Sequence, residues 1–374
     1  MTKLIDICDI QYGYAFDSAC FTEDDSYLPL VRIRDVKRGF SETFYSGEYP
    51  EEYVIHKGDL IVGMDGEFNI ARWKSIDALL NQRVCKLKAK EGTNEEYLRF
   101  ALVKALKTIE DKTAFVTVKH LSAKELNKLE LDMPGIEEQN VRAESMAKLE
   151  KVISHRKEEL SALDNLIKAR FVEMFGDPVK NPKGWEVVTI GDIVTEVRYG
   201  TSKPAVEGGK YPYLRMNNLT ADGHLDLNDL KYIDIPDDEI EKCVVRKGDV
   251  LFNRTNSIEL VGKTVVFDLQ EDMIIAGYII RVRLNKRLLP EILSQYMNLE
   301  ALKDILRSMA KGAVNQANIN AQELQSIKVY IPDMELQKQF IEMKNQVDKS
   351  KVAVQKALDE TQILFDSLMQ KYFG

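Results

Sequence analysis

The sequence of 374 residues contains few of the side chains that build metal sites and disulfide frameworks. Its four cysteines are scattered and form no Cys-x-x-Cys pair, which argues against a zinc ribbon or a disulfide scaffold and for a reducing compartment. No apolar run approaches the ~18–20 residues that a membrane-spanning helix needs. The first ten residues carry two acids and no small-residue cleavage site of a secretory signal. We therefore expect a cytoplasmic protein without a membrane partner.

Catalytic signatures are also missing. The Gly-Lys-Thr at residues 262–264 is not a phosphate-binding loop, because Ser257 stands where the first glycine of that motif belongs. No Gly-x-Gly-x-x-Gly opens a βαβ unit, and no Asn-Pro-Pro-aromatic tetrapeptide of adenine methyltransferases occurs. The four histidines have no Ser, Cys or second His at motif spacing. We interpret the chain as noncatalytic, with no cofactor or metal of its own.

The charge balance excludes nucleic-acid binding through a globally basic surface. The formal net charge is −8, and Lys plus Arg against Asp plus Glu is 19 to 23 in residues 1–135 and 20 to 22 in residues 178–333. The intervening and terminal segments, 136–177 and 334–374, give 7 to 9 and 6 to 6. Any DNA contact must come from local patches, or another subunit must neutralise much of the phosphate charge.

What the sequence does contain is a long, charged, apolar-striped segment in the middle that recurs at the end. A shift of 198 residues places Gln139 on Gln337 and Phe175 on Phe373. Each copy has the pattern of one long helix, Ile136 to Phe175 in the first, which Gly176-Asp177-Pro178 would end. The chain is therefore an internal duplication.

The segments that precede these helices repeat as well, with a shift that drifts from about 183 to 198 because loop lengths vary. The echoed segments are 4–13 with 189–200, 27–36 with 211–219, 53–66 with 243–256, and 120–139 with 318–337. We predict an α+β (mixed α/β) chain of two similar globular domains and two long helices. The predicted divisions are domain 1 at 1–135, the central helix at 136–177, domain 2 at 178–333 and the terminal helix at 334–374.

Local patterns predict the elements of the first domain. Residues 27–33 read as a strand that runs into a basic cluster, and residues 53–62 as a Lys-Gly-Asp turn followed by a strand. A polar loop would then lead to Arg72, Trp73 and Lys74, with Trp73 half in the core. Apolar spacing over 94–107 predicts a helix, and Ser122 with Glu125 forms a capping box. The second domain should repeat this order.

Each long helix carries a stripe at alternating spacings of three and four, typical of a coiled-coil seam. The stripes are Met146, Leu149, Ile153, Arg156, Leu160, Leu163, Ile167, Arg170 and Met174, and Phe340, Lys344, Val347, Lys351, Val354, Leu358, Thr361, Phe365, Leu368 and Tyr372. Charged residues interrupt both, so the pattern fits either two helices packed on their own domains or a pair packed on each other. We predict the pair, and the interruptions suggest a face kept for other subunits. At ~1.5 Å per residue each helix is ~58 Å long, more than one turn of DNA.

A domain followed by a long helix, twice over, resembles the specificity (S) subunit of type I restriction–modification enzymes. The resemblance covers essentially the whole chain and is carried by the junction Phe171–Pro178 and Asn181–Glu186, by the paired Lys-Gly-Asp motifs at 57–59 and 247–249, and by the terminal Met-Gln-Lys-Tyr-Phe-Gly. Each motif alone is weak, but their order and duplication are specific.

The resemblance implies two target recognition domains that each read one half of a split site in double-stranded DNA. Two antiparallel helices would set the spacer and bind two methyltransferase (M) subunits, and the complex would recruit restriction (R) subunits where these exist. S-adenosylmethionine, ATP and Mg would be bound by those partners, and host defence by adenine methylation and cleavage of foreign DNA would be the role of the complex.

Base reading needs Arg, Lys, Asn or Gln side chains on loops that reach a groove. The candidates in the first domain are Arg32, Arg34, Lys37, Arg38, Arg72 and Lys74. Those in the second are Arg215, Asn217, Asn218, Asn253, Arg254, Asn256, Lys311, Asn315 and Gln316. Each could equally be a solvated loop residue or a turn former.

Three further readings stay open beside a DNA-reading scaffold of a restriction system. One is a coiled-coil adaptor that joins proteins without reading DNA, and another is the specificity subunit of a related methylation-only system. The third is a self-sufficient methyltransferase, which would have to bind S-adenosylmethionine as an isolated chain.

Overall fold

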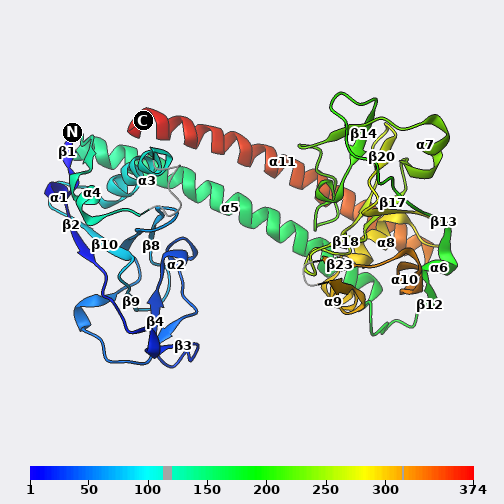
Figure 1. Cartoon of the computed structure of the whole chain (residues 1–374), viewed down its shortest axis with the longest axis horizontal. Coiled ribbons are helices and arrows are strands. Elements are labelled where there is room, and N and C mark those ends of the chain that lie inside the picture. Colours follow the sequence, from blue (N-terminus) through cyan, green and yellow to red (C-terminus); the bar gives the residue numbers. More distant parts are fainter. Residues whose placement is uncertain (113–119, 314–315) are drawn as a thin grey trace. The chain divides into compact units, whose positions relative to one another are not determined.

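The computed structural model describes residues 1–112, 120–313 and 316–374, which fold as two compact units. The first unit comprises Met1–Lys157 with Lys356–Gly374, and the second comprises Glu158–Gln355. Figure 1 shows the elements of each unit. Two long helices, α5 (Ile136–Phe175) and α11 (Met334–Phe373), contribute one half to each unit. Both helices begin and end within a few residues of the predicted segments.

The first unit is built from short strands and helices in an α+β arrangement. Its strands are β1 (Thr2–Lys3), β2 (Cys8–Tyr12), β3 (Phe21–Thr22), β4 (Leu28–Val31), β5 (Phe44–Tyr45), β6 (Val54–Ile55), β7 (Leu60–Gly63), β8 (Ile70–Arg72), β9 (Ala78–Leu80), β10 (Val84–Ala89) and β11 (Glu130–Leu131). Its helices are α1 (Leu4–Ile7), η1 (Ser18–Cys20), α2 (Ile33–Arg38), η2 (Glu51–Tyr53), α3 (Glu95–Lys112) and α4 (Ala123–Lys128). The sheets are β1-β11, β2-β10-β7-β8 and β3-β5-β4-β9-β6, with β4 and β9 parallel.

The second unit repeats this plan. Its strands are β12 (Glu186–Thr189), β13 (Val194–Tyr199), β14 (Tyr211–Leu214), β15 (Lys231–Ile233), β16 (Val244–Val245), β17 (Val250–Asn253), β18 (Thr255–Asn256), β19 (Thr264–Val266), β20 (Met273–Ile275), β21 (Ile279–Leu284), β22 (Lys311–Ala313), β23 (Gln316–Asn318) and β24 (Lys328–Ile331). Its helices are α6 (Ile190–Ile193), η3 (Met216–Asn218), α7 (Asp237–Cys243), α8 (Pro290–Met297), α9 (Glu300–Met309) and α10 (Ala321–Ser326). The sheets β12-β24, β13-β21-β17-β19 and β15-β14-β20-β16 match the three of the first unit, again with one parallel pair, β14 and β20.

The Lys-Gly-Asp turns show how closely the two frames agree. Gly58 and Gly248 have φ of 98° and 93°, a left-handed conformation that glycine adopts without steric cost. In both turns the aspartate accepts a hydrogen bond from the backbone N–H three residues earlier, at 2.8 Å for Asp59 and 2.9 Å for Asp249. The predicted turn-to-strand motif is confirmed in both copies.

One buried glutamine holds the start of each long helix. Gln139 Oε1 accepts from the N–H of Asn94 at 2.9 Å, and its Nε2 donates to Pro134 O at 2.8 Å. Gln337 Oε1 accepts from the N–H of Leu289 at 2.9 Å, and its Nε2 donates to Pro332 O at 2.8 Å. The two glutamines that align in the sequence therefore have the same structural role.

The two long helices pack antiparallel to each other within each unit. In the first unit the guanidinium of Arg156 bonds to Ala357 O and the Thr361 hydroxyl, so a charged interruption of the stripe joins the helices. In the second unit Lys351 pairs with Asp164, while Lys344 pairs within α11 with Asp348. The predicted partner and spacer residues Leu149, Ile153, Arg156, Leu160, Leu163, Ile167, Val347, Val354, Leu358, Phe365 and Leu368 are all buried or half-buried. The helix pair is therefore confirmed.

The helix ends are fixed by local chemistry. Gly176, at φ of 89°, ends α5, and the Trp185 indole donates to Phe175 O at 2.8 Å. The capping box of α4 is present, with Glu125 N–H donating to Ser122 Oγ and the Ser122 N–H donating to Glu125 Oε2. No described helix has both the length and the apolar character that crossing a membrane requires.

Two local predictions were wrong. The strand expected at 27–33 is β4, which ends at Val31, and Arg34, Lys37 and Arg38 of the basic cluster lie on helix α2 instead of a loop. The stretch expected as a polar loop before Trp73 contains strand β8. Pairing of β8 with the preceding strand β7 explains the second error, since strand pairing overrides a polar local pattern. Trp73 is 1% exposed and lies in the core.

Candidate nucleic-acid interface

The candidate readers begin at equivalent places in the two units. In each, the residue after the parallel strand is an arginine that precedes a short helix, Arg32 before α2 and Arg215 before η3. The backbone N–H of Arg32 donates to Asp35 Oδ2 at 3.0 Å, and that of Arg215 donates to Asn218 Oδ1 at 2.8 Å. These caps satisfy N–H groups at the helix start and fix the direction in which the next residues project.

Helix α2 gathers cations on one exposed surface of the first unit. The side chains of Arg34, Lys37 and Arg38 are 60%, 75% and 40% exposed. Lys74 lies against the same turn, because its stem packs over Gly39 and its backbone N–H donates to Gly39 O at 3.3 Å. We call Arg34, Lys37, Arg38 and Lys74 the α2 patch.

The charges of the α2 patch are only loosely neutralised. Arg34 Nε lies 3.7 Å from Asp35 Oδ1, and Lys37 Nζ lies 3.9 Å from Glu67 Oε2. Arg38 makes the one shorter pair, with Glu42 at 3.1 Å, and its guanidinium stacks 4.7 Å from the ring centre of Phe40. The pairs of Lys37 with Glu67 and of Arg38 with Glu42 are exposed and contribute little energy, so they can exchange for a phosphate, whereas Arg34 lies beside the buried Asp35 carboxylate.

The other two predicted residues of the first domain are held by the protein itself. Arg32 Nη2 donates to the Thr43 hydroxyl. Arg72 donates to Gly58 O at 2.7 Å and pairs with Glu95 and Glu96, so its guanidinium joins β8 to α3. Both side chains support the fold beside the patch, and contact between them and DNA stays a prediction.

In the second unit the corresponding surface is hollowed into a cleft of about 620 Å³. Three predicted residues line it, Arg215, Asn217 and Arg254, together with Lys203 and Tyr278. Arg215 Nη2 pairs with Asp229 at 2.7 Å, and Lys203 Nζ pairs with Glu239 at 2.9 Å. We call this the η3 cleft.

Arg254 is the cation of the η3 cleft that contacts no carboxylate among the described residues. Its guanidinium stands 5.0 Å from the ring centre of Tyr199, and its nearest hydrogen bond is a long one of 3.5 Å to Gly277 O. Its Nε is buried without a partner. An arginine held over an aromatic ring with free donors is oriented for a ligand, because little rotamer entropy remains to be lost.

Three predicted asparagines serve the fold. Asn218 is 2% exposed and caps η3, with its Nδ2 donating to Asp226 O at 2.8 Å. Asn253 is fully buried and donates to Thr255 O and Tyr278 O, and Asn256 donates to Asn253 Oδ1. A direct contact of Asn218 or Asn253 with bases would require the surrounding turns to open.

Three predicted positions fall at the edge of what the structure describes. Asn315 lies outside the described residues, as do the side chains of Lys311 and Gln316, whose backbone forms the β22–β23 hairpin. Lys203 and Tyr278 were not predicted as cleft residues. Candidate readers were expected next to the Lys-Gly-Asp strands, and these two residues come from other segments that line the cleft. Tyr278 is 50% exposed, and no sequence pattern indicates this exposure.

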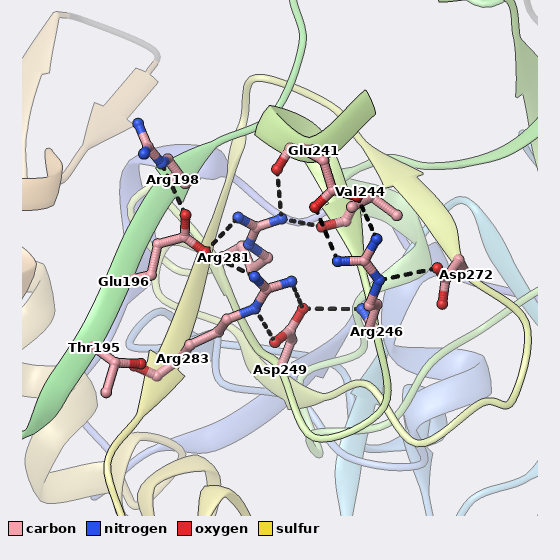
Figure 2. A network of polar contacts seen from close by, with 10 residues as sticks. All are labelled: Thr195, Glu196, Arg198, Glu241, Val244, Arg246, Asp249, Asp272, Arg281 and Arg283. Carbon is pink, nitrogen blue, oxygen red and sulfur yellow. Dashed lines mark hydrogen bonds and ion pairs between the residues drawn. The ribbon is translucent and has the colours of Figure 1, made fainter. Parts of the chain in front are cut away.

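A network of arginines and acids joins strands of the second unit (Figure 2). Arg281, fully buried on β21, donates to Glu196 Oε2 at 2.8 Å, and Arg283 bonds to Glu196 and to Asp249 of the Lys-Gly-Asp turn, each at 2.8 Å. Burial would raise the pKa of Glu196, but the surrounding arginines outweigh it and hold that pKa below its ordinary value. The network fixes β13, β21 and the turn as one frame.

The described residues offer no metal-binding cluster, and two buried cysteines of the first unit have raised pKa values. Among residues 1–112, 120–313 and 316–374, no group of three or more His, Cys, Asp or Glu side chains is placed to hold a metal ion. The thiols of Cys8 and Cys85 are buried, and burial raises the pKa of each to about 12, so neither is a thiolate at neutral pH. The surfaces described above can bind anions and base edges.

Comparison with known proteins agrees with this arrangement. A family model described as the type I restriction modification DNA specificity domain matches residues 1–164 and 182–361. The EcoBI specificity subunit of Escherichia coli is 30% identical over 402 residues, covering 98% of this chain and 84% of that protein. The EcoKI specificity subunit of Escherichia coli K12 is 24% identical, covering 93% and 82%.

Solved structures share the fold. A type I restriction-modification S subunit from M. genitalium superposes with a TM-score of 0.57 at 15% identity, covering 100% of this chain and 95% of that one. A chain from a study of assembly and conformational transition of the type I system gives 0.56 at 20% identity, covering 100% and 96%. The duplicated frame, the twofold family match and these relatives together show that this chain belongs to the specificity subunits of type I restriction-modification systems, their noncatalytic DNA-specificity component.

Proposed function

We propose that this chain reads a split target in double-stranded DNA, with one half-site for each recognition domain. The proposal rests on one observation. The two units share the same arrangement of strands, and each carries a surface with cationic side chains at the equivalent place, the α2 patch in one and the η3 cleft in the other. Arg34, Lys37, Arg38 and Lys74 would contact one half-site, and Asn217 with Arg254 the other. The domains would be residues 1–135 and 178–333.

The long helices would set the spacer between the half-sites and bind the methyltransferase subunits. Their seam faces are buried against each other, while the opposite faces expose apolar side chains, among them Val141 at 63%, Val352 at 70% and Ile363 at 69%. Side chains exposed to this degree are available for contact with a partner subunit. Two M subunits, one for each repeat, fit the duplication, and R subunits would join where the system has them.

Chemistry in this assembly would belong to the partners. S-adenosylmethionine would serve the M subunits, and ATP with Mg the R subunits, in the cytoplasm. The net charge of −8 supports a division of labour, because an acidic chain gains when other subunits neutralise the DNA phosphates.

Deleting the gene and sequencing the methylome of the host tests the proposal. We expect a split adenine-methylated motif that disappears on deletion and returns on complementation. An unchanged methylome in a host with an active system would contradict the proposal and favour a coiled-coil adaptor that does not read DNA.

A substitution of Arg254 tests the η3 cleft. An arginine contact to a base or phosphate contributes about 1–3 kcal/mol, so Arg254→Ala should weaken binding of the assembled complex to its target about 10-fold or more. Lys242→Ala removes an exposed cation of α7 outside the cleft and serves as the matched control. Equal affinities for the two variants would place DNA elsewhere.

A further inference from the structure

One position stands at the same place in both recognition domains but carries a different side chain. At the ends of the parallel strands, Val31 pairs with Leu80 and Leu214 pairs with Ile275, which aligns the two strand ends residue by residue. The next residue in each is the capping arginine described above. Counting on from Arg32 and Arg215, Arg34 and Asn217 occupy the same position, directly before the capping side chains of Asp35 and Asn218.

Neither side chain at this position makes a hydrogen bond to another described residue of the fold. The Arg34 side chain is 60% exposed, and its ion pair with Asp35 is long, at 3.7 Å. Asn217 is exposed, lines the η3 cleft, and makes no side-chain hydrogen bond with any residue that the structure describes. The neighbouring capping side chains, by contrast, are buried, with Asp35 fully buried and Asn218 2% exposed. The frame is therefore fixed from below while this position faces outward.

We infer that residues 34 and 217 are equivalent base-reading positions, where Arg34 selects guanine in one half-site and Asn217 selects adenine in the other. The inference rests on the proposed reading of a split site. Arginine presents two parallel donors that match guanine O6 and N7, whereas the asparagine amide offers one donor and one acceptor that match adenine N6 and N7. The two domains would thus differ in specificity through one outward side chain on a shared frame.

A second equivalent pair shows that the two domains also differ beside this position. The N–H of Met64 donates to Arg83 O at 2.9 Å, and that of Arg254 donates to Tyr278 O at 3.0 Å, in matching turns after β7 and β17. Met64 is 4% exposed and lies in the core, whereas Arg254 reaches the η3 cleft beside Asn217. The second domain therefore places a cation next to its amide, and the first relies on Lys37 and Arg38 of α2.

Exchanging the two side chains tests the inference in the full chain co-expressed with its methyltransferase partner. Long-read sequencing of the host genome would report the methylated motif. We expect Asn217→Arg to change one base of one half-site from adenine to guanine, and Arg34→Asn to make the reverse change in the other half-site. Asn228→Arg, an exposed asparagine of the same unit that does not line the cleft, should leave the motif unchanged.

Alanine variants decide the result if an exchange variant methylates nothing. Asn217→Ala should relax the motif at one base, with about 10-fold less discrimination there. A split motif that neither Asn217→Arg nor Asn217→Ala alters would overturn the inference and leave the proposed function intact. Absence of any split motif with the unaltered chain and its partner would overturn both.

Discussion

Replacing Gln337 with alanine should destabilise the second unit by about 3 kcal/mol. The side chain makes three hydrogen bonds, from Leu289 N–H at 2.9 Å, to Pro332 O at 2.8 Å and to Arg287 O at 3.1 Å, and it is fully buried. Each buried bond contributes about 1 kcal/mol net, and more when its partner is left unsatisfied. No water can replace the glutamine easily, since the site is closed to solvent.

The same change at Gln139 should cost less, about 2 kcal/mol. Gln139 keeps the two shorter bonds, to Asn94 N–H and Pro134 O, but its third contact, to Gly92 O, is 3.4 Å long and therefore weak. Gln346→Ala is the matched control, because Gln346 is an exposed glutamine in the middle of α11, where alanine is at least as favourable for the helix.

Urea unfolding would give the free energies, and native-state hydrogen exchange would locate the loss. In Gln337→Ala the amide of Leu289 should lose protection while that of Asn94 keeps it, and Gln139→Ala should give the reverse. Alanine variants within about 0.5 kcal/mol of Gln346→Ala, or equal loss of protection at both amides, would refute the view that each glutamine holds its own unit.

Two further predictions concern the spacer and pH. One heptad can be inserted into each helix, between Lys157 and Glu158 and between Gln355 and Lys356, which preserves the seam and adds about 10 Å. The spacer of the methylated DNA motif should then lengthen by about 3 base pairs. An unchanged spacer would show that the helices do not set its length. The pKa of Glu196 is lower in the folded chain than its ordinary value of 4.5, so its contribution to the free energy of unfolding is present above pH 4.5 and is lost as the pH falls through the folded pKa. Glu196→Gln should therefore destabilise the chain at pH 7 and progressively less below pH 4.5. Urea titrations at several pH values would measure this difference. If the difference in unfolding free energy between the unaltered chain and Glu196→Gln stayed constant down to about pH 3, the Glu196 carboxylate would not contribute to stability through its charge.

The long helices were predictable almost to the residue because their signal is local. A stripe at spacings of three and four extends from Met146 to Met174 of α5, and the left-handed Gly176 ends the helix. The Lys-Gly-Asp turns were predictable for the same reason. Strand β8 was not, because its residues read as polar loop until β7 pairs with them.

The candidate readers show a different limit. Asn217 and Asn218 are adjacent and chemically identical, yet one faces the cleft and the other caps η3 from inside. Composition cannot separate them, since the same amide suits a cap and a base edge. What separates them is the direction of the backbone after β14, which depends on its pairing with β20, a strand that follows much later in the sequence.

This adjacency bears on how specificity and stability can vary independently. A change at Asn218 would remove a cap and leave the Arg215 N–H without its acceptor, at a cost of about 1 kcal/mol, whereas a change at Asn217 removes no bond within the described fold. In the first unit a change at Asp35 would likewise leave the Arg32 N–H without its acceptor, whereas a change at Arg34 removes only the long ion pair with Asp35, at 3.7 Å. Because each unit separates an inward cap from an outward reader by a single residue, new half-sites can be selected at 34 and 217 while both frames keep their hydrogen bonds.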